Sequence, residues 1–152
     1  MTVAIHPTRE SLAAFLRDIP SGEPVTMLNL LRFRDIASYA ADNRYADISG
    51  SEAFAIYARL MMPLIAEFGG EVVWLGKAAS SLVAPLGEHW DEVVLVRYPD
   101  KDAFVNMTTT NKYVEVSVHR TAALADSRLI ALIEGQVQQA ANHPSFALTN
   151  HD

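Results

Sequence analysis

The sequence predicts one α+β domain whose strands and helices follow the order β-α-β-β-α-β, after an additional N-terminal helix. The 152 residues are 50% hydrophobic and 20% charged, a composition typical of a globular chain with one sizeable core. Short apolar runs bounded by Gly and Pro predict strands, and longer segments with apolar residues three or four positions apart predict helices. Cysteine is absent, which excludes disulfides and thiolate metal sites.

The first predicted element is a helix that begins after Thr8, a residue type that caps helices. The turn from Pro20 to Pro24 ends it. We therefore expect three parts: an N-terminal helical extension (residues 1–22), a main domain (residues 23–134) and a partly ordered C-terminal tail (residues 135–152).

The first strand is predicted over residues 25–33 (VTMLNLLRF). A polar loop over residues 35–50 follows, and long loops of this kind are often functional or mobile. Ser49 and Glu52 predict a capping box at the start of a long helix, which Pro63 bends and two glycines at 69–70 end.

The second half of the chain predicts three more strands, over residues 71–84, 90–98 and 127–134. The second of the four strands is interrupted near Gly76. Helical segments over residues 101–107 and 111–125 lie between the last two strands. The resulting order is the split-βαβ, ferredoxin-like arrangement, in which the helices cover one face of the sheet.

The other face of the sheet also requires a cover. Alternate residues of a strand point to opposite faces, and both faces of the first strand are mainly apolar over residues 25–31. An antiparallel sheet with one wet face shows a cleaner alternation of apolar and polar residues. We therefore expect a homodimer, in which a second subunit covers the free face.

Charge and motifs exclude several classes of function. Eighteen Asp and Glu outnumber twelve Lys and Arg, giving a net charge of −6, so neither a nucleic acid nor a membrane is an expected partner. Without a signal peptide or an apolar span, the expected location is the cytoplasm. The five histidines lack metal-ligand spacing, and no nucleotide-binding or serine-hydrolase motif is present, so no metal and no cofactor are expected.

His119 is the candidate catalytic residue, because an unperturbed histidine changes charge near pH 6.5. It lies in the predicted helix 111–125, where a side chain can reach a pocket between helix and sheet. The alternative is a half-buried histidine bonded to backbone or solvent. Asn29 is a candidate ligand-binding residue: an unpartnered amide in an apolar strand would cost about 1–3 kcal/mol, so a ligand, a neighbouring strand or water must satisfy it.

Three larger side chains complete the candidate ligand-binding set. Trp74 and Trp90 lie on predicted strands, where an indole packs in a core, an interface or a pocket. Arg97, like Arg32 and Arg34, is suited to an anionic ligand, since guanidinium pairs well with carboxylate; the alternative is a solvated or ion-paired arginine.

Five segments together resemble a known family, the domain-of-unknown-function 1330 family. They are EPVTMLNLLRF (23–33), SGSEAF with the following Tyr, Met and Pro (49–63), GGEVVWLG (69–76), the segment from EHWD to VRYP (88–99), and YVEVSVHRTAALADSRLI (113–130). The resemblance covers roughly residues 23–134. It implies a dimeric α+β barrel, in which two ferredoxin-like sheets meet back to back, and it implies no particular reaction.

These observations predict a protein that binds a small, partly apolar organic molecule in a pocket at the sheet of the dimer. If it is an enzyme, the expected chemistry is cofactor-independent, that of a monooxygenase or an isomerase, with His119 as acid or base. The alternative is a non-catalytic, stress-associated or structural dimer. A further alternative is haem binding, in which Asn29, Trp74 or Trp90, and His119 as axial ligand, resemble the layout of haem-degrading α+β barrels.

Overall fold

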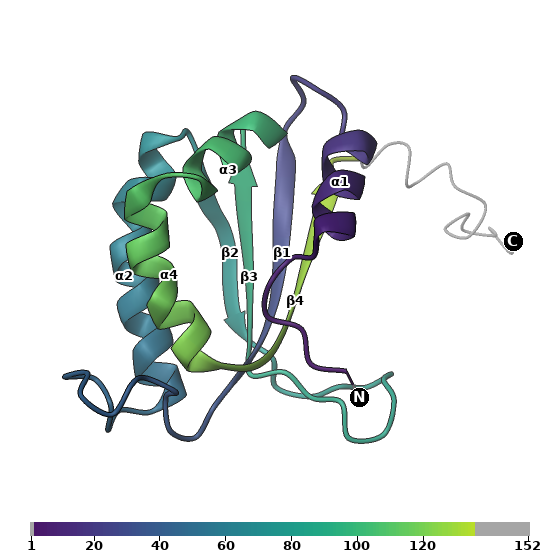
Figure 1. Cartoon of the computed structure of the whole chain (residues 1–152). Coiled ribbons are helices and arrows are strands. Elements are labelled where there is room, and N and C mark those ends of the chain that lie inside the picture. Colours follow the sequence, from purple (N-terminus) through teal and green to yellow (C-terminus); the bar gives the residue numbers. More distant parts are fainter. Residues whose placement is uncertain (1, 136–152) are drawn as a thin grey trace, which may run out of the picture.

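The computed structural model describes residues 2–135, and the predicted tail from residue 136 onward lies outside the described residues. Four strands form one antiparallel sheet in the order β2-β3-β1-β4. This confirms the predicted ferredoxin-like α+β fold (Figure 1). The elements in chain order are α1 (Arg9–Asp18), β1 (Val25–Phe33), α2 (Gly50–Glu67), β2 (Glu71–Lys77), β3 (Glu92–Tyr98), α3 (Lys101–Thr108), α4 (Asn111–Ala123) and β4 (Leu124–Ile133).

Four strand boundaries differ from the sequence prediction, two of them slightly: β3 begins at Glu92 rather than at residue 90, which leaves Trp90 outside the strand, and β4 ends at Ile133 rather than at residue 134. The second strand ends at Lys77 rather than at residue 84, because Lys77 pairs with Glu92, the first residue of β3, and residues 78–91 leave the sheet as a long loop. The fourth strand begins at Leu124 rather than at residue 127, because a register shift lets Leu124 pair with Phe33 at the end of β1. Strand length here depends on the partner strand.

The helices α2 and α4 lie side by side over one face of the sheet (Figure 1). Their apolar side chains meet the inward-facing residues of β1 and β3, as helix packing on a sheet requires. The main buried cluster includes Val25, Met27, Val96 and Tyr98 from the sheet and Met61, Leu64, Ile65, Met107 and Val116 from the helices.

The N-terminal helix is capped at its start and attached to this core through its C-terminal half. The Thr8 hydroxyl accepts from the Ser11 N–H at 3.0 Å, and the Ser11 hydroxyl accepts from the Thr8 N–H at 2.9 Å. The predicted cap is therefore present. Phe15 packs edge-on against Phe104 of α3, with ring centroids 5.6 Å apart. The Lys101 ammonium donates to the carbonyls of Leu16 and Ile19, at 2.6 and 2.8 Å, where α1 ends.

The opposite face of the sheet, here called the outer face, is apolar and half-exposed. Ile130 and Trp74 keep 45% and 51% of their surface exposed. The register places both on the face that carries every second residue of β1, starting with Thr26. The apolar members of this face are Leu28, Leu30, Trp74, Val93, Leu95, Ile130 and Leu132.

Asp126 is a buried carboxylate that fixes the N-terminal segment to β4. Its Oδ1 accepts from the Ala4 N–H at 2.9 Å, from its neighbour Ser127 at 2.8 Å and from the Arg128 guanidinium at 2.7 Å. Arg32 lies 3.9 Å from the other oxygen. Burial alone would raise the pKa of Asp126, but these bonds outweigh it and hold the pKa below its ordinary value.

We expect Asp126→Asn to lower the free energy of unfolding at pH 7 by about 2–4 kcal/mol, because Arg128 loses its buried anionic partner. A lowered native pKa contributes stability above the unfolded value of about 3.9, and this contribution is lost as the pH falls through the native pKa. Urea unfolding at pH 7 and pH 3 should therefore show a difference between wild type and variant that shrinks in acid.

The matched control is Asp18→Asn, since Asp18 forms only an exposed ion pair with Arg17. It should change stability by less than about 0.5 kcal/mol at both pH values. An equal loss for Asp126→Asn at pH 7 and pH 3 would contradict the role of the ionised carboxylate.

Candidate functional site

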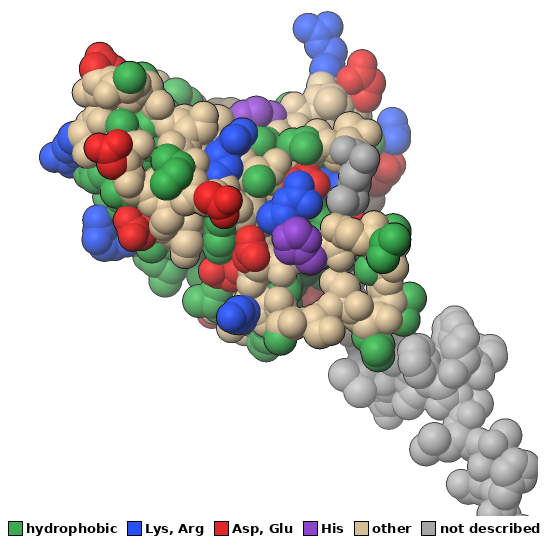
Figure 2. Space-filling model, turned by 90° about the horizontal axis from the view of Figure 1, so that it is seen from below, with side chains coloured by type: hydrophobic (Ala, Val, Ile, Leu, Met, Phe, Trp, Pro, Cys, Tyr) green, Lys and Arg blue, Asp and Glu red, His purple; other side chains and the backbone are tan. Residues whose placement is uncertain are grey.

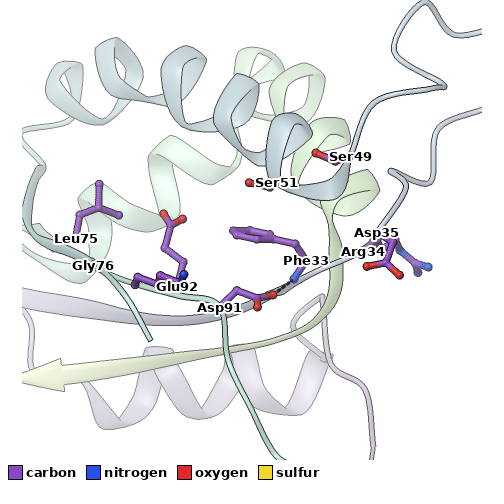
Figure 3. A pocket seen from close by; sticks show the side chains of 10 residues that line it. Phe33, Arg34, Asp35, Ser49, Ser51, Leu75, Gly76, Asp91 and Glu92 are labelled. Carbon is purple, nitrogen blue, oxygen red and sulfur yellow. Dashed lines mark hydrogen bonds between the residues drawn. The ribbon is translucent and has the colours of Figure 1, made fainter. Parts of the chain in front are cut away.

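A cleft of about 600 Å³ lies between the first turn of α2 and the paired ends of β2 and β3 (Figure 3). Its lining combines the apolar side chains of Phe33 and Leu75 with the charged residues Lys77 and Glu92. Ser51 adds a hydroxyl from the first turn of α2. Charged residues also include Arg34, Asp35 and Asp91, so the cleft offers a bound molecule a small apolar patch within a mostly polar and charged lining.

The shape of the cleft depends on close contact between three backbone segments at Gly50. The Gly50 N–H donates to the Arg34 carbonyl at 3.0 Å, and the Arg34 N–H donates to the Ala123 carbonyl at 2.8 Å. A Cβ atom at Gly50 would meet the Arg34 backbone and lie 2.6 Å from the Ala123 oxygen. Because glycine has no Cβ atom, it lets α2 begin directly on the ends of β1 and α4.

Ser49 caps α2 beside this contact. Its hydroxyl accepts from the Glu52 N–H at 3.0 Å, which forms the first half of the predicted capping box. The helix N-terminus and Lys77 thus both border the cleft and favour negative charge, while Asp35, Asp91 and Glu92 in the same lining oppose it.

Glu92 is one of the titratable groups that line the cleft. Its carboxylate rises from the start of β3 toward α2, between Leu75 and Phe33 (Figure 3). Burial raises the pKa of Glu92, because the charged form loses hydration there. A carboxyl with a raised pKa, next to apolar side chains in a cleft, is a candidate proton donor or acceptor.

Sequence reasoning missed Glu92, although a signal was present. Every second residue of β3 faces the helices, and this set reads Glu92, Val94, Val96 and Tyr98. An acidic residue at the start of an otherwise apolar, inward-facing row indicates a polar end of the core. Its neighbour Asp91 has a different role, because its carboxylate accepts from the Phe33 N–H at 2.8 Å and holds β1.

His119, the predicted catalytic residue, lies outside the cleft, in contact with the loop over residues 34–49. Its Nδ1 is 2.5 Å from the Tyr39 hydroxyl, in a hydrogen bond, and Tyr45 packs edge-on against its ring at 5.3 Å. Burial and the charge of Arg44 both lower the pKa of His119. The predicted long loop is thus held on α4 by an aromatic cluster of Tyr39, Tyr45 and His119.

The predicted ligand-binding residues are spread over the sheet. The Asn29 amide donates to the Met27 and Val94 carbonyls, both at 3.3 Å, so two strands satisfy it. Trp74 lies on the outer face with its ring over Gly76. The Arg128 guanidinium stacks over Trp90 at 5.2 Å.

Arg97 lies at the opposite end of the sheet from the cleft. It pairs with Glu134 at 3.2 Å and borders a smaller cavity of about 380 Å³. Arg34, by contrast, lines the cleft, while its Nε donates to the Leu124 carbonyl at 3.1 Å. Of the two cavities described, Arg97 borders the smaller one, and His119, Asn29 and the two tryptophans border neither.

The surface around the cleft carries charges of both signs. Figure 2 views the end of the molecule at which the loop 34–49 and the loop 78–91 lie, and shows Lys and Arg interspersed with Asp, Glu and hydrophobic side chains. Within residues 2–135, no three His, Asp or Glu side chains are grouped as metal ligands, and no helix is long and apolar enough to cross a membrane.

Comparison with known proteins places these features in a family. Residues 33–136 match the model of a family described as "Domain of unknown function (DUF1330)". The protein of unknown function RPA0582 from Rhodopseudomonas palustris is 41% identical, with a TM-score of 0.80 over 89% of this chain and 99% of that one. Its methylated form superposes similarly, with 41% identity and a TM-score of 0.81 over 90% and 98%.

A more distant structure shares the fold alone. Hydroxynitrile lyase from Passiflora edulis is 11% identical, with a TM-score of 0.52 over 76% of this chain and 96% of that one. A search of curated proteins finds no match.

We expect Gly50→Ala to lower the free energy of unfolding by at least about 2 kcal/mol, because the new methyl group meets backbone atoms that a rotamer change cannot move. Urea unfolding measures the effect. Ser51→Ala, at the next and exposed position of the same turn, is the control and should stay within about 0.5 kcal/mol of wild type. Equal midpoints for Gly50→Ala and wild type would show that the three segments are not in close contact.

His119 should titrate below the ordinary histidine pKa of about 6.5. Arg44→Gln removes one of the two causes, so it should raise the pKa of His119 part of the way, with burial still holding it down. NMR titration of the histidine ring protons, assigned with His119→Gln, measures both. Lys112→Gln on the same helix should leave the value unchanged; a similar shift in that control would mean that the effect is not specific to Arg44.

Proposed function

The chain belongs to the family described as domain of unknown function DUF1330, and on that premise we propose that it binds a small, partly apolar organic molecule in the cleft beside α2. The observation that supports this proposal is the lining of the cleft. Phe33 and Leu75 offer apolar contact on either side of the Glu92 carboxylate. A molecule with an apolar body and one polar, proton-bearing centre fits this arrangement.

The chemistry that suits the cleft is proton transfer without a cofactor. Glu92 in its carboxylate form accepts a proton from a C–H bond next to a carbonyl group, and the bonding electrons move to the carbonyl oxygen as an enolate. The ammonium of Lys77 and the start of α2 stabilise that negative charge. Return of the proton to another carbon gives isomerisation, and a cofactor-independent monooxygenase begins with the same removal of a proton.

The raised pKa of Glu92 makes it a stronger base than an ordinary glutamate once it is ionised. Activity should fall with decreasing pH, and it should do so at a higher pH than for an ordinary glutamate. The assignment of acid–base chemistry to His119 stays a prediction. We favour Glu92 because it points into the cleft, whereas His119 is bonded to Tyr39.

The second candidate is a non-catalytic homodimer. The apolar outer face supports it, since exposed Trp74 and Ile130 lie on one continuous sheet surface with Leu28 and Leu30. We propose that two copies join through their outer faces to form the dimeric α+β barrel. Such a dimer leaves the cleft free, because the cleft lies on the helix side of the sheet.

We expect the wild-type protein to catalyse exchange of the hydrogens next to the carbonyl of small cyclic and aromatic ketones in D₂O, followed by proton NMR. Glu92→Gln should lower the exchange rate at least about 100-fold, because the amide cannot accept the proton. Glu88→Gln removes a nearby carboxylate that does not line the cleft and should keep the wild-type rate.

Equal rates for Glu92→Gln and wild type would remove Glu92 from the reaction. If no ketone exchanges and none alters the NMR signals of the cleft residues, the non-catalytic dimer becomes the better description.

A further inference from the structure

The loop between β2 and β3, residues 78–91, is here called the arm, and it exposes more apolar surface than any role within this chain explains. Leu82, Val83 and Leu86 are 95%, 94% and 105% exposed. Single exposed hydrophobic residues are ordinary on a protein surface. Three almost fully exposed hydrophobic side chains within five positions indicate an interaction surface.

The arm nevertheless has a defined shape. At its base the Ala78 N–H donates to the Asp91 carbonyl at 3.0 Å, and the Asp91 N–H donates to the Leu31 carbonyl of β1 at 2.7 Å. At its tip the Glu88 N–H donates to the Pro85 carbonyl at 3.1 Å, around Gly87 with a positive φ of 84°. Ordering a segment costs conformational entropy, and burial of its apolar side chains against a partner would offset that cost.

The arm leaves the sheet on the side of the outer face. Trp90, near its end, packs against Arg128, and Arg128 pairs with Leu30 on the outer face. Figure 1 shows the arm extending past the ends of the strands toward the N-terminal segment, on the other side of the sheet from α2 and α4. Its apolar tip therefore projects toward whatever covers the outer face.

We propose that the arm is a clasp for a second copy of this chain, which buries Leu82, Val83 and Leu86 of one subunit against the partner. This inference rests on the proposed homodimer through the outer faces. In a two-fold symmetric dimer, a contact between the arm of one subunit and the outer face of its partner occurs twice. An apolar arm and an apolar sheet face on the same chain can therefore each contact the other surface on the partner. The clasp adds to the area that the sheet faces bury.

The charge of the arm favours this occupant. Residues 78–87 contain no charged side chain, so the tip approaches another copy with net charge −6 without like-charge repulsion. The arm also contains no Lys or Arg, which an anionic lipid surface would attract. The apolar stretch from residue 78 to residue 87, with Glu88 as the carboxylate that follows it, fits the apolar face of a second copy.

Sedimentation velocity over a dilution series tests the clasp in the full-length protein. The arm variant combines Leu82→Ser, Val83→Ser and Leu86→Ser, and it should raise the dimer Kd at least about 100-fold, since three apolar side chains per subunit lose their burial. Circular dichroism should show an unchanged fold, because these side chains are almost fully exposed in the described part of the subunit. Val114→Ser with Val118→Ser, on the exposed side of α4, is the control and should leave the Kd unchanged.

A separate variant, Ile130→Glu on the outer face, distinguishes the clasp from the dimer itself. If Ile130→Glu weakens the dimer and the arm variant does not, the clasp is refuted and the proposed homodimer stands. A wild-type protein that is monomeric at every concentration refutes the homodimer and the clasp together. Loss of binding to phosphatidylcholine vesicles in the arm variant of such a monomer would assign the arm to a membrane instead.

Discussion

The contact at Gly50 is the constraint on which the rest of the structure depends. Here the end of β1, the start of α2 and the end of α4 meet. The Gly50 N–H donates a backbone hydrogen bond to Arg34, and the Arg34 N–H donates one to Ala123. Because no side chain intervenes, the two helices are fixed against the sheet at one end, and their apolar faces must then pack along its length. The cleft is a product of the same contact, since the first turn of α2 is one of its walls.

Two buried or half-buried carboxylates show how differently one chemical group is used. Asp126 is fully buried and its Oδ1 accepts three hydrogen bonds, so the bonds outweigh burial and its pKa is lowered. Burial dominates at Glu92 and raises its pKa. The first carboxylate stays ionised and joins the N-terminal segment to β4. The second lies in a cleft, where a raised pKa suits the proposed proton transfer.

Sequence reasoning was most successful where a signal is local. The strand Val25–Phe33 was predicted with its observed bounds, because an apolar run lies between a Pro-rich turn and a polar loop. The predicted end of the second strand, residue 84, lies seven residues beyond the observed end at Lys77. Residues 78–84 resemble a strand in sequence but have no partner strand there. The candidate site was less accessible still. The contact between Tyr39 and His119 joins residues 80 positions apart, and the cleft position of Glu92 follows from register and helix placement together.

The cleft and the arm share a single junction, and this links the two proposed roles of the sheet. Asp91 is the last residue of the arm and Glu92 is the first residue of β3. Asp91 bonds to Leu31 and, through its carboxylate, to Phe33, which lines the cleft beside Glu92. A partner that holds the arm therefore also limits the motion of the residue before Glu92. In the proposed dimer, each subunit thus steadies the carboxylate in the other's cleft without contributing a side chain to it.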